Sequence, residues 1–195
     1  MTARTGIRSL LSFACLGVLG CDHARDQAEP NASLGTCVPA DAPPPDDVVF
    51  EIGCNIAGAA TDETYWTLHD DDEAPIIRGT VNSGQLMLVT AVRTNAFPSS
   101  CSRVAVTAEL TLDDGTPLGK LSHKKRPMLD AGGGIRYLLN VFLVVPEDRP
   151  TFGLPNSWEG RRATLRVAMF VDDGAGGSVL RQESVVPVTL HEKAL

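Results

Sequence analysis

Apolar and polar residues alternate with a period of two in two stretches of the chain, at residues 102–113 and 162–172. Successive side chains of a β-strand point to opposite faces, so this period is typical of a strand that buries one face. The predicted inward-facing residues are Val104, Val106, Ala108, Leu110 and Leu112 in the first stretch and Leu165, Val167, Met169 and Val171 in the second. Both stretches are therefore predicted to be half-buried strands.

Turn signals divide the rest of this region into further strands. Asp113-Asp114-Gly115 predicts a turn into a strand at 117–122, and the glycine-rich residues 173–177 predict a turn into a strand at 179–190. Pro187 cannot donate a backbone hydrogen bond, so the last strand is expected at a sheet edge.

Two segments, 85–92 and 136–145, are apolar on both faces and are predicted to be fully buried strands. A helix is conceivable for the second, but its β-branched residues and its flanks, Gly132-Gly133-Gly134 and Pro146, favour a strand. Weaker strands are expected at 48–52, 65–69 and 75–81, and no segment has a sustained helical stripe. The pattern predicts an all-β fold, an antiparallel sandwich over residues 47–195.

The turns of this region resemble those of immunoglobulin-like modules in bacterial cell-surface proteins. Asn82-Ser83-Gly84 precedes a strand, Leu112-Asp113-Asp114-Gly115 forms one hairpin, and Val171-Asp172-Asp173-Gly174 forms the last. This resemblance covers roughly half of the chain, Gly84 to Leu190, and implies an immunoglobulin-like β-sandwich.

The N-terminus has the three regions of a secretory signal. Arg4 and Arg8 precede an uncharged, mostly apolar run of about 12 residues, which is too short to span a membrane. The run ends in Val18-Leu19-Gly20-Cys21, which resembles the lipobox of bacterial lipoproteins. The resemblance implies that residues 1–20 are removed as a signal peptide and that Cys21 carries lipid, such as palmitate. Ordinary cleavage and an uncleaved anchor are the alternatives.

Residues 21–46 are expected to form a disordered tether behind the lipidated cysteine. They are rich in proline and aspartate, including Pro43-Pro44-Pro45 and Asp46-Asp47 at the end, and have few apolar side chains. Such a composition does not bury enough surface to repay the entropy of ordering the chain. The tether would hold the domain off a membrane, facing the periplasm or the cell surface.

Charge excludes one class of partner. Without the leader and its two arginines the chain has 15 basic and 24 acidic side chains, a net charge of about −9. Nucleic-acid binding needs clustered Lys and Arg, so none is expected. The short basic run Lys124-Lys125-Arg126 is interpreted as a solvated strand end.

Three cysteines remain beyond Cys21: Cys37, Cys54 and Cys101. Disulfides persist in an exported protein, and three thiols allow one bridge and one unpaired cysteine. Cys54 with Cys101 is the favoured pair because both flank predicted strands, and Cys37 with Cys54 is the alternative. No CxxC motif supports a redox role.

The sequence offers no catalytic, metal or cofactor signature. Asp70-Asp71-Asp72-Glu73 and Asp172-Asp173 lack the spacing of a calcium loop, so both are interpreted as solvated loops. There is no GxSxG motif, and Gly132-Gly133-Gly134 precedes a strand, which favours a hairpin tip over a phosphate loop. Trp158 is interpreted as a plug at the end of the sandwich, with an exposed carbohydrate or partner contact as the alternative.

Two classes of function remain. The favoured class is a membrane-anchored envelope lipoprotein whose domain is a noncatalytic interaction or structural module, with a protein or glycan partner in the envelope. The alternative is a small ligand-binding or hydrolytic envelope protein whose site is built from loops.

Overall fold

The computed structural model describes residues 43–56, 61–78, 85–98, 100–146, 158–172 and 177–193. These residues form strands, with one short 3₁₀ helix at Asp62–Thr64 as the sole helix among them. The strands are β1 (Phe50–Asn55), β2 (Tyr65–Thr67), β3 (Asp72–Arg78), β4 (Leu86–Thr94), β5 (Arg103–Leu112), β6 (Pro117–Pro127), β7 (Leu129–Asp130), β8 (Arg136–Val145), β9 (Arg162–Asp172) and β10 (Ser178–Lys193). The all-β prediction is confirmed, and each predicted strand is present with shifted or identical bounds.

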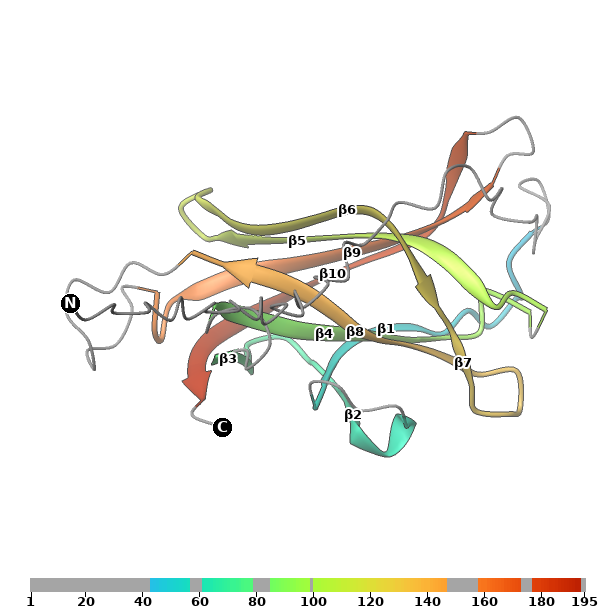
Figure 1. The fold of residues 1–195 in the computed structure, drawn as a ribbon, viewed down its shortest axis with the longest axis horizontal. Helices are drawn as coiled ribbons and strands as arrows, with labels where there is room; N and C mark the ends of the chain where they lie inside the picture. Colours follow the sequence, from blue (N-terminus) through green and yellow to red (C-terminus); the bar gives the residue numbers. More distant parts are fainter. Residues whose placement is uncertain are drawn as a thin grey trace, which may run out of the picture. The chain divides into compact units, whose positions relative to one another are not determined.

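The strands form two groups of hydrogen-bonded neighbours. One group runs β6-β5-β9-β10 and is antiparallel throughout. In the other group β4 pairs with β8 and β1, β8 pairs with β7, and β1 pairs with β2. Figure 1 shows β5 and β6 side by side along the top of the domain, and β10 running from the upper right to the lower left, where it ends beside β3.

Strand β3 joins the two groups into one mixed sheet. Its residues Ile76–Arg78 pair with β4, and its residues Asp72–Ile77 pair with Val188–Lys193 of β10. The β3–β10 pair is parallel, so the expectation of a purely antiparallel sheet is wrong at this pair. Parallel pairing is available here because most of the domain lies between the two strands in sequence, far more than the crossover that parallel strands need.

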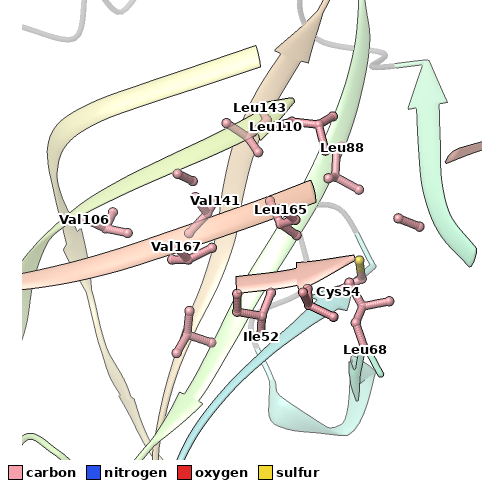
Figure 2. Close-up of a cluster of buried hydrophobic side chains, with 14 of the residues drawn as sticks. Ile52, Cys54, Leu68, Leu88, Val106, Leu110, Val141, Leu143, Leu165 and Val167 are labelled. Atoms are coloured by element: carbon pink, nitrogen blue, oxygen red, sulfur yellow. The ribbon is translucent and has the colours of Figure 1, made fainter. Parts of the chain in front are cut away.

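The two groups face each other across one hydrophobic core. Figure 2 shows Leu88, Val141 and Leu143 of β4 and β8 beside Val106, Leu110, Leu165 and Val167 of β5 and β9. All the inward-facing residues predicted from the period of two are buried. Burying one such side chain contributes on the order of 1.5–3 kcal/mol, so this face-to-face contact is the main source of stability.

The two doubly apolar segments behave differently. β4 is buried along nearly its whole length, because its outer residues Met87 and Val89 pack with Ile77 and Phe142 in a second, smaller cluster. In β8 burial alternates and Val144 is 45% exposed, so the prediction of a fully buried strand is wrong for 136–145. The short outer cluster ends at Phe142 and leaves Val144 uncovered.

A pair of asparagines shapes β8 where it bulges against β4. The register shifts between Thr90 and Val92, and Asn140 adopts a left-handed φ of 58°. Asn55, at the end of β1, is 3% exposed, and its Oδ1 accepts from the Asn140 backbone N–H at 3.1 Å. Its Nδ2 donates to Ile56 O at 2.9 Å and to Asn140 Oδ1 at 3.1 Å. The buried amide thereby satisfies the backbone that the bulge releases.

The two groups also approach each other where β6 passes β8. A Cβ on Gly119 would lie 2.9 Å from the carbonyl oxygen of Val144 and 3.5 Å from Leu143 Cβ. Only glycine fits this contact without displacing backbone.

Candidate interaction face

The first part of β10 has an open edge. β9 pairs with β10 from Ser178 to Thr189, but β3 pairs with it only from Val188 onward. No other strand of the described ranges pairs with residues 178–187, which we term the open half of β10. The expectation that the last strand lies at a sheet edge is wrong for the strand as a whole, because β10 lies between β3 and β9 in the strand order. Its second half is interior from Pro187 onward, since the Pro187 carbonyl accepts from the Asp71 N–H at 2.9 Å and Val188 begins the pairing with β3.

Exposed apolar side chains gather on the open half of β10. Val179, Leu180 and Val185 are 39%, 50% and 51% exposed. A surface that combines exposed aliphatic groups with an unpaired strand edge favours contact with another molecule.

A hollow of about 360 Å³ lies beside the open half, on the outer face of β6-β5-β9-β10. Four charged residues, one from each strand, line it: Lys120, Glu109, Arg166 and Glu183. We call these four residues the charge ladder, because their signs alternate from β6 to β10. Ala168, Phe170 and Leu180 supply its apolar wall.

The register between neighbouring strands places the charged residues of the ladder next to one another. Glu109 lies directly opposite Lys120 on one side and Arg166 on the other. Lys120 Nζ is 2.6 Å from Glu109 Oε1, and Arg166 Nη2 is 2.6 Å from Glu183 Oε2. The hydrogen bond from Lys120, with the charges of Lys120 and Arg166, lowers the pKa of Glu109. The hydrogen bond to Glu183, with the charges of Glu183 and Glu109, raises the pKa of Arg166.

These ion pairs contribute little to folding because they are exposed. Lys120 and Arg166 have 63% and 53% of their side-chain surface in solvent. Pairs of this kind are worth roughly 0–1 kcal/mol each. The ladder is therefore a minor contributor to the stability of the domain.

A second hollow, of about 580 Å³, lies between the open half of β10 and strands β1 and β2. Its lining includes Phe50, Ile52, Thr67, His69 and Val185. Val185 also lies opposite Arg166, beside the charge ladder. The open half of β10 is thus flanked by a hollow on either side.

Arg181 ties the start of the described chain to this region. It lies at a β-bulge between Leu180 and Gln182, where the register with β9 shifts. Its Nε donates to Ala96 O at 3.4 Å, and its Nη2 donates to Pro43 O at 3.2 Å. The chain before β1 therefore reaches the domain beside the open half of β10.

Asn95 holds the following residues of that chain in place. Its Nδ2 donates to Asp47 O at 2.7 Å, and its Oδ1 accepts from Val49 N–H at 2.8 Å. The leader, Cys21 and residues 22–42 of the predicted tether lie outside the described residues.

The cysteines do not pair as predicted. Cys54 is a free thiol, fully buried among Ile52, Leu68 and the rest of the core, whereas Cys101 is disulfide-bonded. The expected Cys54–Cys101 bridge is therefore wrong, and so is the Cys37–Cys54 alternative. Burial raises the pKa of the Cys54 thiol to about 12. Its flanking position suggested a bridge, but Cys54 faces inward in β1 and packs as an apolar side chain.

The acidic clusters are held by arginines and by backbone. Asp71 has a left-handed φ of 69° and pairs with Arg162, which also lies 3.8 Å from Asp113. Asp72 Oδ2 accepts from His69 N–H at 2.7 Å. Asp172 is 8% exposed, while Asp173 lies outside the described residues. The described residues contain no group of three side chains placed to hold a metal ion.

Three other sequence features have definite places. Gly132-Gly133-Gly134 forms the turn between β7 and β8 with positive φ throughout, which confirms the hairpin tip. Trp158 is 5% exposed and belongs to the main core, as expected of a plug. Lys124-Lys125-Arg126 lies near the end of β6.

Comparison of the sequence with protein-family models and with curated proteins finds no match. Within the described ranges, no helix has the length and apolar character to cross a membrane.

Proposed function

We propose that this protein is a membrane-anchored lipoprotein of the bacterial envelope whose β-domain is a noncatalytic interaction or structural module. The observation that carries the anchor is the sequence Val18-Leu19-Gly20-Cys21 at the end of a short apolar run. Cys21 would carry the lipid, and the segment to Asp46 would link it to the domain. The first strand begins at Phe50, soon after that segment.

We further propose that the domain is an immunoglobulin-like sandwich. That fold places strands A-B-E-D in one sheet and G-F-C in the other, with C′ added beside C in some members. The neighbours β3-β4-β8-β7 correspond to the first order and β10-β9-β5-β6 to the second. Strands β1 and β2 are additions at the edge of β4 under this assignment.

The open half of β10 and the charge ladder are the surface that we assign to a protein or glycan partner. Leu180 and Val185 supply apolar contact, and the four charges beside them supply directionality. Interfaces commonly combine an apolar centre with a polar rim in this way.

The anchor is tested by Cys21→Ala in the full-length protein. The variant should remain unprocessed and incorporate no labelled palmitate, and it should leave the detergent phase after phase separation. Wild-type protein that carries no palmitate and partitions like the variant would refute the anchor.

The interaction surface is tested by a photo-crosslinking residue placed at Leu180 or Val185 in living cells. Val144 is a matched control, because it is an exposed aliphatic residue of a strand, at 45% against 50% and 51%, on β8. Crosslinked products are expected from the first two positions and not from the control. Equal yields at all three positions, or no product at Leu180 and Val185, would contradict the assignment.

A further inference from the structure

Cys101 is disulfide-bonded, and the other cysteine of the described ranges, Cys54, is a free thiol. The chain has five cysteines: Cys15, Cys21, Cys37, Cys54 and Cys101. Cys54 is free and fully buried, and a thiol held protonated by burial is a poor participant in disulfide exchange, which requires the thiolate. Under the proposed lipid anchor, Cys15 leaves with the leader and the sulfur of Cys21 is blocked by lipid. Cys37 is the remaining thiol.

The surroundings of Cys101 agree with a partner from the N-terminal side. Cys101 is buried in the turn between β4 and β5, where its N–H donates to Pro98 O at 2.9 Å. Arg136, also buried, donates to the same carbonyl at 2.7 Å and to Met128 O at 3.3 Å. These bonds fix the turn that carries the sulfur.

The incoming chain lies at the same turn. The guanidinium group of Arg181 joins Pro43 O to Ala96 O, and Asn95 binds Asp47 and Val49. Cys37 precedes Pro43 by six residues, which span at most about 20 Å when extended. A disulfide needs its Cα atoms within roughly 7 Å, and a segment of this length gives Cys37 that reach.

We propose that Cys37 and Cys101 form a disulfide that fastens the tether to the domain. The two thiols lose two protons and two electrons as the S–S bond forms. An exported thiol–disulfide oxidant accepts them, and its own disulfide opens to a dithiol. The bond would bring the attachment point forward from Asp46 to Cys37, leaving 15 residues (22–36) between the lipidated cysteine and the attachment point in place of 24 (22–45).

The experiment counts free thiols in full-length protein extracted from membranes in detergent. The protein is denatured without reductant, treated with a maleimide polymer and resolved by mass. Wild-type protein should gain one polymer at Cys54, Cys37→Ser should gain two, and the matched control Cys54→Ser should gain none. Cys101→Ser should also gain two by releasing Cys37. Because labelling follows denaturation, the count does not depend on whether a variant folds.

Peptide mapping identifies the bond directly. Cleavage after Arg and Glu should give fragments 26–51 and 94–103 joined until reductant is added, with 52–63 unlinked. A link from 94–103 to the fragment bearing Cys54 or Cys21, or a single label on Cys37→Ser, would overturn the proposal. The inference rests on the proposed lipid anchor only where it excludes Cys21 as the partner of Cys101. A link to Cys21 would refute both proposals, whereas loss of palmitate with an intact 26–51 link would refute the anchor alone.

Discussion

Replacing Asn55 by Ala should destabilise the domain by about 2–4 kcal/mol. The amide makes three hydrogen bonds at the β8 bulge, to Ile56 O, Asn140 Oδ1 and Asn140 N–H, and its residue is 3% exposed. Leaving the Asn140 N–H without this acceptor costs roughly 1–3 kcal/mol, and losing the other two bonds adds about 1 kcal/mol. The loss is therefore a large part of the free energy of unfolding, which is typically about 5–15 kcal/mol for a domain.

The matched variant is Asn140→Gly. Glycine adopts the φ of 58° without strain and keeps the backbone N–H that bonds Asn55, so only the Asn140 side chain is lost. Its cost should be about 1 kcal/mol or less. Urea unfolding followed by circular dichroism measures both variants. If Asn55→Ala falls within 0.5 kcal/mol of wild type, or if Asn140→Gly costs as much as Asn55→Ala, the assignment of the bulge to this amide is refuted.

Three further predictions concern packing, the buried thiol and the acidic loop. Gly119→Ala should cost about 1–3 kcal/mol, seen as a lower melting temperature, because the new methyl group meets the Val144 carbonyl; an unchanged melting temperature would contradict the close approach. Cys54, whose pKa rises from 9.0 to about 12, should have about a thousandfold smaller thiolate fraction at pH 7 than in unfolded protein, so native alkylation should be at least that much slower. Rapid alkylation of Cys54 in the native protein would refute its burial. The stability contributed by the raised pKa of Cys54 is fully present below pH 9 and is lost as the pH rises towards 12. The variant Cys54→Ala should not show this loss of stability at high pH. Calcium and chelator should give the same melting temperature, since Asp71 is paired with Arg162, and an increase of several degrees with calcium that disappears in Asp71→Asn would show a metal site.

Much of the strand content could be predicted because it depends on local patterning. The alternation at 162–172 gives the bounds of β9, and the turn signals give the hairpin from β5 to β6. Strand partners are a different matter, since they depend on contacts distant in sequence. Nothing near Asp72 indicates that it pairs with Val188 in parallel. The exposure of Val144 also depends on which elements cover β8, and its own sequence does not reveal that.

The candidate interaction face was largely missed for the same reason. Glu109 and Arg166 each stand at an outward position of an alternating strand, which was a usable signal for charges on one face. Their alignment with Lys120 and Glu183 requires the register of four strands. The cysteine prediction failed because proximity to a strand does not tell which face a side chain takes, and Cys54 faces the core.

The pairing of β3 with β10 has a consequence for the order in which this chain acquires structure. Asp72 is synthesised first, and its partner Val188 follows 116 residues later. Until then β3 lacks one neighbour, and the two groups of strands that it joins lack this connection. Contacts so distant in sequence slow folding, because a long loop must close before they form. The native sheet is therefore completed only once β10 is available to pair with β3.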